Sequence, residues 1–264
     1  MVSPEDVKAT HALDEIYTKH PFYGSRRMRI DLALDYGISI GREHIRRLMR
    51  LMGLEAIYRK IRPRTSDPNA DHRVYPYLLG SLTAAYPNHI WGTDITYIRL
   101  QGGFCYLVAV IDWYSRYVVH WELSATLEIE FCLANLTQAL RVAIPTIHNS
   151  DQGSHFTSPR YTDLLVEAKV QISMDGRGRC MDNIFTERLW RTVKYEEVYL
   201  KSYASIAEAR QSLTEYFRFY NDERRHSSLG YQTPATLYGA NKKPASAGCK
   251  MQSLNISNLS TILV

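Results

Sequence analysis

The chain has 264 residues, of which 45% are hydrophobic and 22% are charged, a balance that excludes a largely disordered protein and allows a substantial core. No apolar run is long enough to cross a membrane, and the first residues lack the basic-then-apolar pattern of a secretory signal, so we expect a cytoplasmic protein. The net charge of +5 permits nucleic-acid binding without requiring it.

Residues 1–64 are predicted to form a small all-α module of the helix-turn-helix kind. One amphipathic helix is expected over residues 5–20, and the segment from His20 to Ala56 has the pattern of helix, turn, helix. In its last part, apolar residues recur at spacings of three and four, which is the period of a helix face: Ile45, Leu48, Met49 and Met52.

The basic charge of the chain is concentrated at the end of this module. Residues 41–64 contain eight basic residues and two acidic ones. A solvated helix face would explain such a run by itself. In the stretch YRKIRPR, however, aromatic and basic residues interleave, which favours contact with nucleic acid. The candidate DNA-binding residues of the module are Arg46, Arg47, Arg50, Arg59 and Lys60.

A linker is expected over residues 65–88, where prolines alternate with Ser, Asn and Asp. Residues 89–240 then have the pattern of a second domain. Three strands rich in β-branched and aromatic residues come first, in WGTDITYIRL, FCYLVAVID and RYVVHWEL, joined by short turns as in an antiparallel meander. A helix, a short strand, a helix and a short strand follow, so the class is α/β.

Two long helices, in MDNIFTERLWRTVKYEEVY and SIAEARQSLTEYFRFYNDERR, complete the predicted core. The segment HSSLGYQTPATLYG has turn chemistry. Residues 241–264 are rich in Ser, Asn and Lys without periodicity, and we expect a disordered tail there.

Three acidic residues lie in or beside elements that otherwise have core composition. Asp94 interrupts the first strand, Asp151 ends the fourth, and Glu187 lies on the helix after a Gly-rich loop. Burying an ionised carboxylate is costly unless a cation or donors compensate it. Mg²⁺ or Mn²⁺ suits such oxygen ligands and keeps positions open for water and phosphate oxygens.

The helix that carries Glu187 is predicted to have one polar face. Asn183, Arg191 and Lys194 fall within about 40° of Glu187, and apolar residues fall opposite. Such a face could bind metal through the carboxylate while its neighbours hold DNA phosphates. An exposed ion pair between Glu187 and Arg191, four residues apart, is the alternative for this helix taken alone.

Several linked motifs resemble the second-frame (OrfB) transposases of the insertion sequence 3 family, which share a catalytic core with retroviral integrases. The resemblance covers about residues 13–238 and includes PFYGSRRM, WGTDITYI, HNSDQGSHFTS, GRCMDNIFTERLWRTVKYE and RRHSSLGYQTPA. Between Asp151 and Glu187 lie 35 residues, 152–186, which is the spacing of the family signature, and Lys194 matches a basic position of the family.

This resemblance implies a ribonuclease-H-like domain, a mixed five-stranded sheet flanked by helices, with Asp94 and Asp151 on adjacent strands and Glu187 on a helix. It also implies a DDE-type polynucleotidyl transferase that uses two Mg²⁺ or Mn²⁺ ions for in-line displacement at phosphorus. Family chemistry would free a 3′-hydroxyl at one element end, join the ends into a circle and insert that circle into target DNA.

The resemblance further implies DNA partners, namely element ends with inverted repeats and a target, together with a first-frame (OrfA) DNA-binding partner or fusion and a homo-oligomer on DNA. The protein would be bacterial and nucleoid-associated when bound. Two rival functions remain: an inactive or regulatory DNA-binding product of the element, and a ribonuclease-H-type nuclease that cuts without joining.

A second group of polar residues has weaker support. His155 lies in the motif around Asp151 and could orient a phosphate or water, although a structural imidazole is the more common role. Arg224, Arg225 and His226 could bind phosphate, but packing of their segment on the core is favoured. Asp112 should lie near Asp94, yet aspartate at a strand end more often stabilises a turn.

Overall fold

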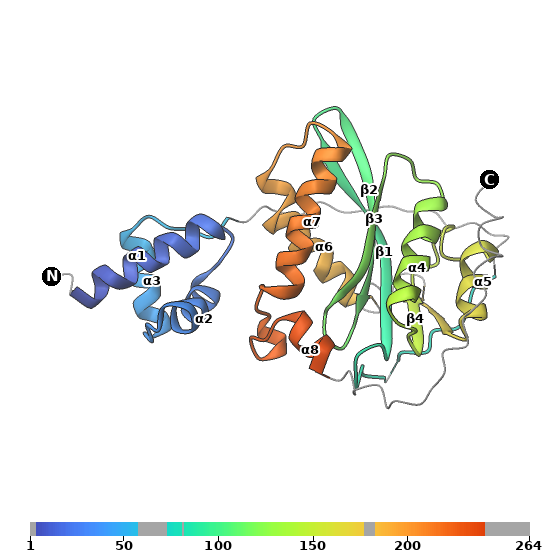
Figure 1. The fold of residues 1–264 in the computed structure, drawn as a ribbon, viewed down its shortest axis with the longest axis horizontal. Coiled ribbons are helices and arrows are strands. Elements are labelled where there is room, and N and C mark those ends of the chain that lie inside the picture. Colours follow the sequence, from blue (N-terminus) through green and yellow to red (C-terminus); the bar gives the residue numbers. More distant parts are fainter. Residues whose placement is uncertain (1–3, 58–72, 81, 177–182, 241–264) are drawn as a thin grey trace.

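A central five-stranded sheet organises the second domain of the computed structural model, which describes residues 4–57, 73–80, 82–176 and 183–240 (Figure 1). The strands are β1 (Ile90–Leu100), β2 (Gly103–Asp112), β3 (Val118–Ser124), β4 (Ile147–Ser150) and β5 (Gln171–Met174), in the spatial order β3-β2-β1-β4-β5. The first three strands pair antiparallel, and β4 and β5 are parallel to β1. The predicted mixed sheet and the antiparallel meander are confirmed.

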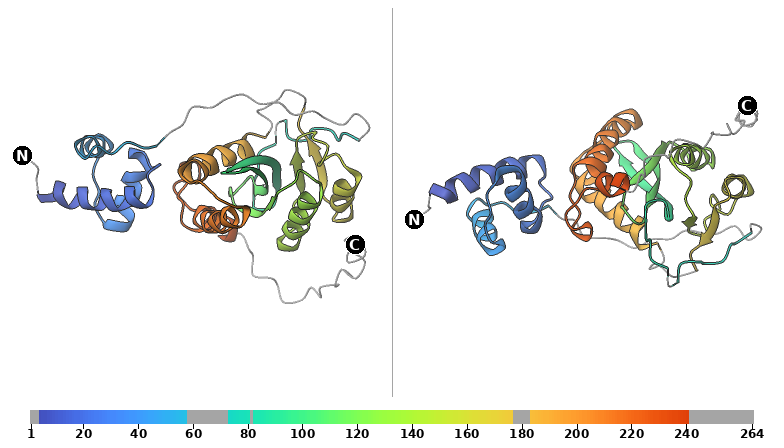
Figure 2. Two further views of the ribbon diagram at one scale, coloured as in Figure 1. Left: turned by 90° about the horizontal axis from the view of Figure 1, so that it is seen from above. Right: turned by 60° about the horizontal axis from the view of Figure 1, so that its bottom comes forward.

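Helices cover both faces of this sheet, as the view from above shows (Figure 2). They are α4 (Glu130–Val142), α5 (Pro159–Glu167), α6 (Ile184–Glu196), α7 (Ile206–Asp222) and α8 (Pro234–Ala240), with short 3-10 turns η1 (Val198–Leu200) and η2 (Ser227–Leu229). On one face, α6 contacts β1 and α7 contacts β3. On the other face, α4 contacts β2 and β3, and α5 contacts β5.

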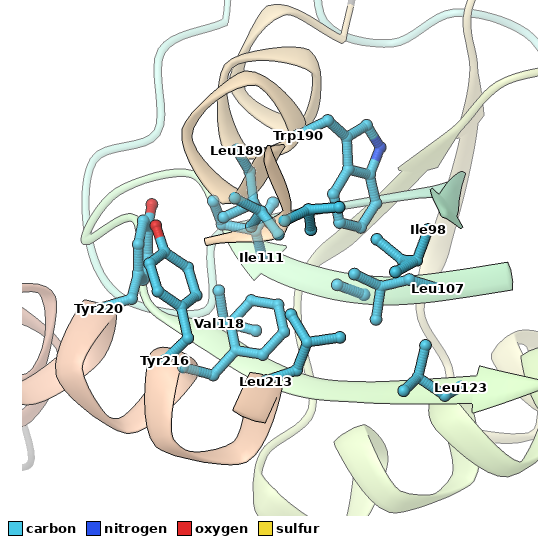
Figure 3. Packing of buried hydrophobic residues seen from close by; sticks show 14 of the residues in the cluster. Ile98, Leu107, Ile111, Val118, Leu123, Leu189, Trp190, Leu213, Tyr216 and Tyr220 are labelled. Carbon is cyan, nitrogen blue, oxygen red and sulfur yellow. The ribbon is translucent and has the colours of Figure 1, made fainter. Parts of the chain in front are cut away.

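The alternation of side chains along β2 separates two cores. Leu107, Ala109 and Ile111 are buried with residues of α6 and α7, and Figure 3 shows Leu107 and Ile111 facing these helices. Val108, one position along, is buried with residues of α4 and α5. A strand with both faces covered becomes a nearly continuous apolar run, which is why FCYLVAVID has almost no polar residue.

The N-terminal helical module consists of α1 (Pro4–Lys19), α2 (Ser25–Tyr36) and α3 (Arg42–Leu51) around their own apolar core. Helix α2 ends at Gly37, which has the left-handed φ of 68° that favours glycine at a helix C-terminus. The predicted helix-turn-helix arrangement of three short helices is confirmed, and none of the helices in the described ranges has the length and apolarity that a bilayer crossing requires.

The helical module contacts the second domain through α6, α7 and the segment after α7. The imidazole ring of His20 stacks on Phe219 with 4.7 Å between centroids. Arg27 donates to Glu196 at 2.6 Å, and Arg225 donates to Asp31 at 2.7 Å. Apolar packing and charged hydrogen bonds therefore join residues nearly 200 positions apart in the sequence, a contact that the sequence patterns did not predict.

Two segments differ from the sequence expectations. Part of the predicted linker packs on the sheet: Leu78 N–H donates to Ser173 Oγ at 3.1 Å, and Leu79 is buried. The segment expected to be a turn continues into helix α8, because Thr233 accepts from Thr236 N–H and Pro234 suits the first helical position. The predicted tail, residues 241–264, lies outside the described residues.

Candidate functional site

Asp94 and Asp151 belong to neighbouring parallel strands. Strand β1 pairs with β4 with Gly92 opposite Asn149. Asp94 is two residues beyond Gly92, and Asp151 is two residues beyond Asn149, immediately after the strand. Continued for two residues, this register would set the two aspartates at the same level, because parallel strands advance together.

Asp151 is held at the rim of the sheet by its own loop. Gly153 N–H donates to its Oδ1 at 2.9 Å. Burial raises the pKa of the Asp151 carboxyl above its ordinary value, although this hydrogen bond and the nearby His155 lower it. The ionised carboxylate is thus incompletely compensated by its protein neighbours, which is the condition in which a bound cation is most favourable.

Glu187 is exposed in the first turn of α6. One side chain before it in the sequence and one after it attach this helix to β1. Asn183 Nδ2 donates to Thr93 O at 3.2 Å. Trp190 Nε1 donates to Asp94 Oδ2 at 2.9 Å. Asn183 and Trp190 lie about 40° and 60° from Glu187 around the helix, so the side of α6 next to the glutamate faces the aspartate strand.

The close approach of α6 to β1 depends on Gly92. A Cβ at this position would meet Trp113 Nε1 in direct overlap and would lie 2.8 Å from Thr186 Oγ1. We predict that Gly92→Ala moves the start of α6 away from β1 and destabilises the fold by about 1–3 kcal/mol, the range of overpacked cores. Urea unfolding measures this loss, and Gly102→Ala, where a Cβ meets nothing within 4 Å, is the matched control. Equal stability of the two variants would contradict the close approach.

Asp94 lies on β1, Asp151 follows the neighbouring strand β4, and Glu187 lies on α6, which contacts β1; the three carboxylates do not form a closed ligand set. Across residues 4–57, 73–80, 82–176 and 183–240, no three His, Cys, Asp or Glu side chains are arranged to hold a metal ion. Carboxylates that share a site repel one another unless a cation is present, so separation is the expected state of the protein alone. The donor set of Asp94, Asp151 and Glu187 consists of oxygens only, which fits Mg²⁺ or Mn²⁺.

Basic residues continue along α6 beyond Glu187. Arg191 is exposed, with its guanidinium 5.7 Å from the centroid of the Tyr195 ring. Lys194 is half-buried in the last turn. Both residues are on the helix that carries Glu187, as the sequence predicted, and remain candidates for phosphate contact.

Asn183 was also expected to contact DNA, and the structure gives it a different role. Its side chain is buried, and its amide is used within the protein: Nδ2 donates to Thr93 O, and Oδ1 accepts from Thr186 Oγ1 at 2.5 Å. His155 likewise forms an internal hydrogen bond, between its Nε2 and Leu127 O at 2.8 Å. Both side chains therefore stabilise the loops and helix around the aspartates.

The arginines of the helical module lie on or near the surface of α3. Arg46 pairs with Glu43 at 3.0 Å, and Arg47 pairs with Asp6 at 2.8 Å. Arg50 is exposed in the last turn of the helix. These arginines lie on a different element from the aspartates, and the other two candidates, Arg59 and Lys60, lie outside the described residues.

The RRH motif packs inside the protein, as the favoured sequence interpretation held. Arg224 is buried and forms two hydrogen bonds with Glu196, from Nε at 2.6 Å and Nη2 at 2.7 Å. Arg225 pairs with Asp31 and Asp35 of α2. Burial, with a contribution from Arg224, lowers the pKa of His226 to about 2, so this imidazole is neutral and offers no positive charge to a phosphate.

Asp112 is not near Asp94, contrary to expectation. It pairs with Trp91, three residues before Asp94 along β1. Its carboxylate accepts from Asn88 N–H at 2.8 Å and from Ser115 N–H at 2.8 Å, so the predicted turn-stabilising role is confirmed.

Sequence reasoning missed three residues at or beside the site. Trp190 could have been found by extending the helical projection, because it falls about 60° from Glu187 on the side opposite Arg191. Gly92 carried the signal of a glycine inside a strand, which often marks close backbone approach. Arg116 carried none, because its contact with Phe185 arises only in the folded chain.

Family comparisons agree with the domain content of the chain. The integrase core domain family matches residues 84–180 and again residues 168–234, and the HTH-like domain family matches residues 4–62. Together these matches span both the helical module and the sheet with its carboxylates.

Individual relatives are similar over most of their length. The insertion element IS600 uncharacterized 31 kDa protein of Shigella sonnei is 32% identical over 89% of this chain and 88% of its own. The transposase for insertion sequence element IS629 of Shigella sonnei is 32% identical over 82% of this chain and 73% of its own. The transposase for insertion sequence element IS904 of Lactococcus lactis is 32% identical over 75% and 80%.

Solved structures share the fold at low sequence identity. A chain in the structure of the simian T-cell lymphotropic virus intasome in complex with PP2A regulatory subunit B56 gamma has a TM-score of 0.54 at 13% identity, over 91% of this chain and 78% of its own. The HTLV-2 integrase catalytic core, in complex with magnesium, has a TM-score of 0.50 at 18% identity, over 59% and 99%. The ribonuclease-H-like fold is thereby confirmed. From the motifs, the domain matches and the relatives, this chain belongs to the insertion-sequence transposases with an integrase core domain, the insertion sequence 3 family.

Proposed function

We propose that this transposase is a DDE-type polynucleotidyl transferase whose Asp94, Asp151 and Glu187 form the catalytic centre for cutting and joining DNA strands. The observation that carries the proposal is the pairing of β1 with β4, in which Gly92 lies opposite Asn149, two residues before Asp94 and Asp151 respectively. The attachment of α6 to β1 on both sides of Glu187 supports the third member.

Asp94, Asp151 and Glu187 would hold the divalent ions, and the magnesium complex of the HTLV-2 integrase core supports Mg²⁺ as the natural cofactor. Two bound ions would supply Lewis acidity and neutralise charge on the phosphate oxygens. The chain's own residues fix the ligands: Trp190 N–H sets the rotation of the Asp94 carboxyl, and Gly153 N–H sets that of Asp151. Substituting such orienting partners typically lowers metal affinity or activity by about 10–100-fold.

DNA is the proposed substrate, as element ends with inverted repeats and as target. The exposed arginines of α3 and α6 would contact phosphates, and the HTH-like domain match supports DNA contact by the helical module. The intasome that contains a structural neighbour supports assembly of several copies on DNA. A first-frame DNA-binding partner would add recognition of the element ends.

Metal removal tests the proposal directly. Labelled oligonucleotides that carry the element ends are incubated with the chain alone and with the chain fused to the first-frame product. We expect nicked and joined products with Mg²⁺ or Mn²⁺, none with excess EDTA, and recovery after Mg²⁺ is restored. Products formed equally in EDTA would contradict metal catalysis. Cleavage without joining in the fused protein would favour the nuclease alternative.

A further inference from the structure

A cleft of about 560 Å³ lies between the helical module and helices α6 and α7. Seven arginines and a single carboxylate, Glu196, line it. Glu196 is paired with Arg27 and Arg224, and both of those arginines are among the seven. The other five, Arg26, Arg42, Arg116, Arg188 and Arg191, have no carboxylate partner within the described part of the chain. The cleft is therefore strongly positive and complementary to an anion.

Arg116 is the most unusual of these arginines. It comes from the tight turn between β2 and β3 with a left-handed φ of 63°, and its guanidinium stacks 3.5 Å above the Phe185 ring. Its Nη1 is buried, and no hydrogen-bond acceptor reaches it among the residues that the structure describes. A buried guanidinium donor without an acceptor is costly, so it points to an acceptor that the described residues do not supply.

The acidic group nearest in sequence does not meet this need. Asp112, four residues before Arg116, already accepts from Asn88 N–H, Ser115 N–H and Ser115 Oγ. Burial, together with repulsion from Arg188, lowers the pKa of Arg116 to about 10. The group thus still carries its charge at neutral pH, and no carboxylate among the described residues forms an ion pair with it.

Aromatic side chains alternate with the arginines in the wall of the cleft. Tyr195 and Tyr231 are half-buried there, and the Arg191 guanidinium lies 5.7 Å from the centroid of the Tyr195 ring. Arginines combined with aromatic rings are typical of sites for single-stranded nucleic acid, where phosphates pair with the cations and bases stack. The size of the cleft suits one or a few nucleotides of a single strand.

The cleft also adjoins the proposed catalytic centre. Around α6, Arg191 lies about 40° and Arg188 about 100° from Glu187, on the side opposite Trp190. A strand that leaves the carboxylates can therefore cross Arg191 and Arg188 to reach Arg116.

We propose that this arginine cleft binds the phosphodiester backbone of a short single-stranded DNA segment, with Arg116 contacting one phosphate. The inference rests on the proposed function, since it takes DNA as the ligand. It adds a site for unpaired DNA that is separate from the carboxylates and from the exposed arginines of α3.

Binding in EDTA tests the cleft independently of catalysis. A labelled oligothymidylate of about 12 nucleotides, within the range that single-strand sites cover, and a duplex of equal length are titrated by fluorescence anisotropy. We expect Arg116→Gln to weaken single-strand binding about tenfold and to reduce the salt slope by about 0.7, the value for one phosphate contact. Arg188→Gln, an exposed position, should weaken it several-fold, and Arg141→Gln on α4 should have no effect.

Thermal melting establishes that each variant is folded. If Arg116→Gln is unfolded, the single-strand affinity of Arg188→Gln tests the proposal. Unchanged single-strand affinity, or an equal loss for the duplex, would overturn the proposal. Millimolar inorganic phosphate and unlabelled oligothymidylate are each added as competitors of the labelled oligonucleotide. If phosphate displaces it as effectively as oligothymidylate does, the cleft is instead a site for free phosphate. No cleavage in Mg²⁺ by the wild type fused to the first-frame product, with normal single-strand binding, would reject the triad alone. Active strand transfer with unaltered single-strand binding in the cleft variants would reject the cleft alone.

Discussion

Replacing Asp151 by asparagine should abolish strand cleavage and joining while leaving DNA binding nearly unchanged. Asparagine has the same shape and still accepts from Gly153 N–H, but it loses the charge that a divalent ion requires. Substitution of even an outer partner of a metal ligand costs about 10–100-fold, so we expect a loss of at least about 100-fold for a ligand itself. The loss of activity is measured as the amount of cleaved and joined product that each protein forms from element-end oligonucleotides in Mg²⁺.

A stability measurement separates this loss from misfolding. Because burial raises the folded-state pKa of Asp151, the folded metal-free protein binds a proton more readily than the unfolded chain, and stability falls as pH rises through that pKa. At neutral pH the variant should therefore melt at a higher temperature than the wild type in EDTA, by about 2–4 °C for each kcal/mol gained.

Magnesium should raise the melting temperature of the wild type and not that of the variant, because only the wild type gains binding energy. Asp163→Asn, at an exposed position on α5, is the control and should keep both activity and the magnesium response. Full activity of Asp151→Asn, or an equal magnesium response in both proteins, would remove Asp151 from the metal site.

The second large effect is expected at Glu196, where Glu196→Gln should destabilise the protein by about 3–5 kcal/mol. Glu196 accepts from Arg224 Nε at 2.6 Å, from Arg27 Nη1 at 2.6 Å and from Tyr216 OH at 3.1 Å. Glutamine would leave the buried Arg224 guanidinium without a counter-charge, which is the costly way to break such a pair. Urea unfolding at neutral pH measures the difference.

The pH dependence of this difference identifies its cause. Burial by itself would raise the pKa of Glu196, but Arg224 and Arg27 outweigh it and hold the pKa below the ordinary value. The stabilisation is therefore fully present above the unfolded pKa of about 4.3 and is lost as pH falls through the lower folded-state value. The difference in the free energy of unfolding between wild type and Glu196→Gln should therefore decrease over that acid range.

Two further variants complete the measurement. Glu167→Gln, at an exposed position on α5, should leave stability unchanged at every pH. The double variant Glu196→Met with Arg224→Met should be more stable than Glu196→Gln, since removing both charges leaves none buried alone. The role of the ion pair would be contradicted if the difference in the free energy of unfolding between wild type and Glu196→Gln stayed constant at acid pH. It would also be contradicted if the double variant were less stable than Glu196→Gln.

The amino-acid sequence determined the local elements and the identity of the three carboxylates. The β-branched and aromatic runs of β1 and β2 and the helical periodicity of α6 follow from the backbone geometry of strands and helices, so they can be recognised residue by residue. The spacing of Asp151 and Glu187 belongs to a continuous motif and needed no structure. The order of strands and helices then follows the chain.

Tertiary structure alone decided how each polar side chain is used. Arg224 meets Glu196 across 28 residues, and Arg225 meets Asp31 across 194, so no local pattern distinguishes them from arginines that face DNA. Asn183 and Trp190 acquire their partners only when α6 packs on β1. A polar group contributes through the acceptor or donor that folding places beside it, and that neighbour is set by the packing of distant segments.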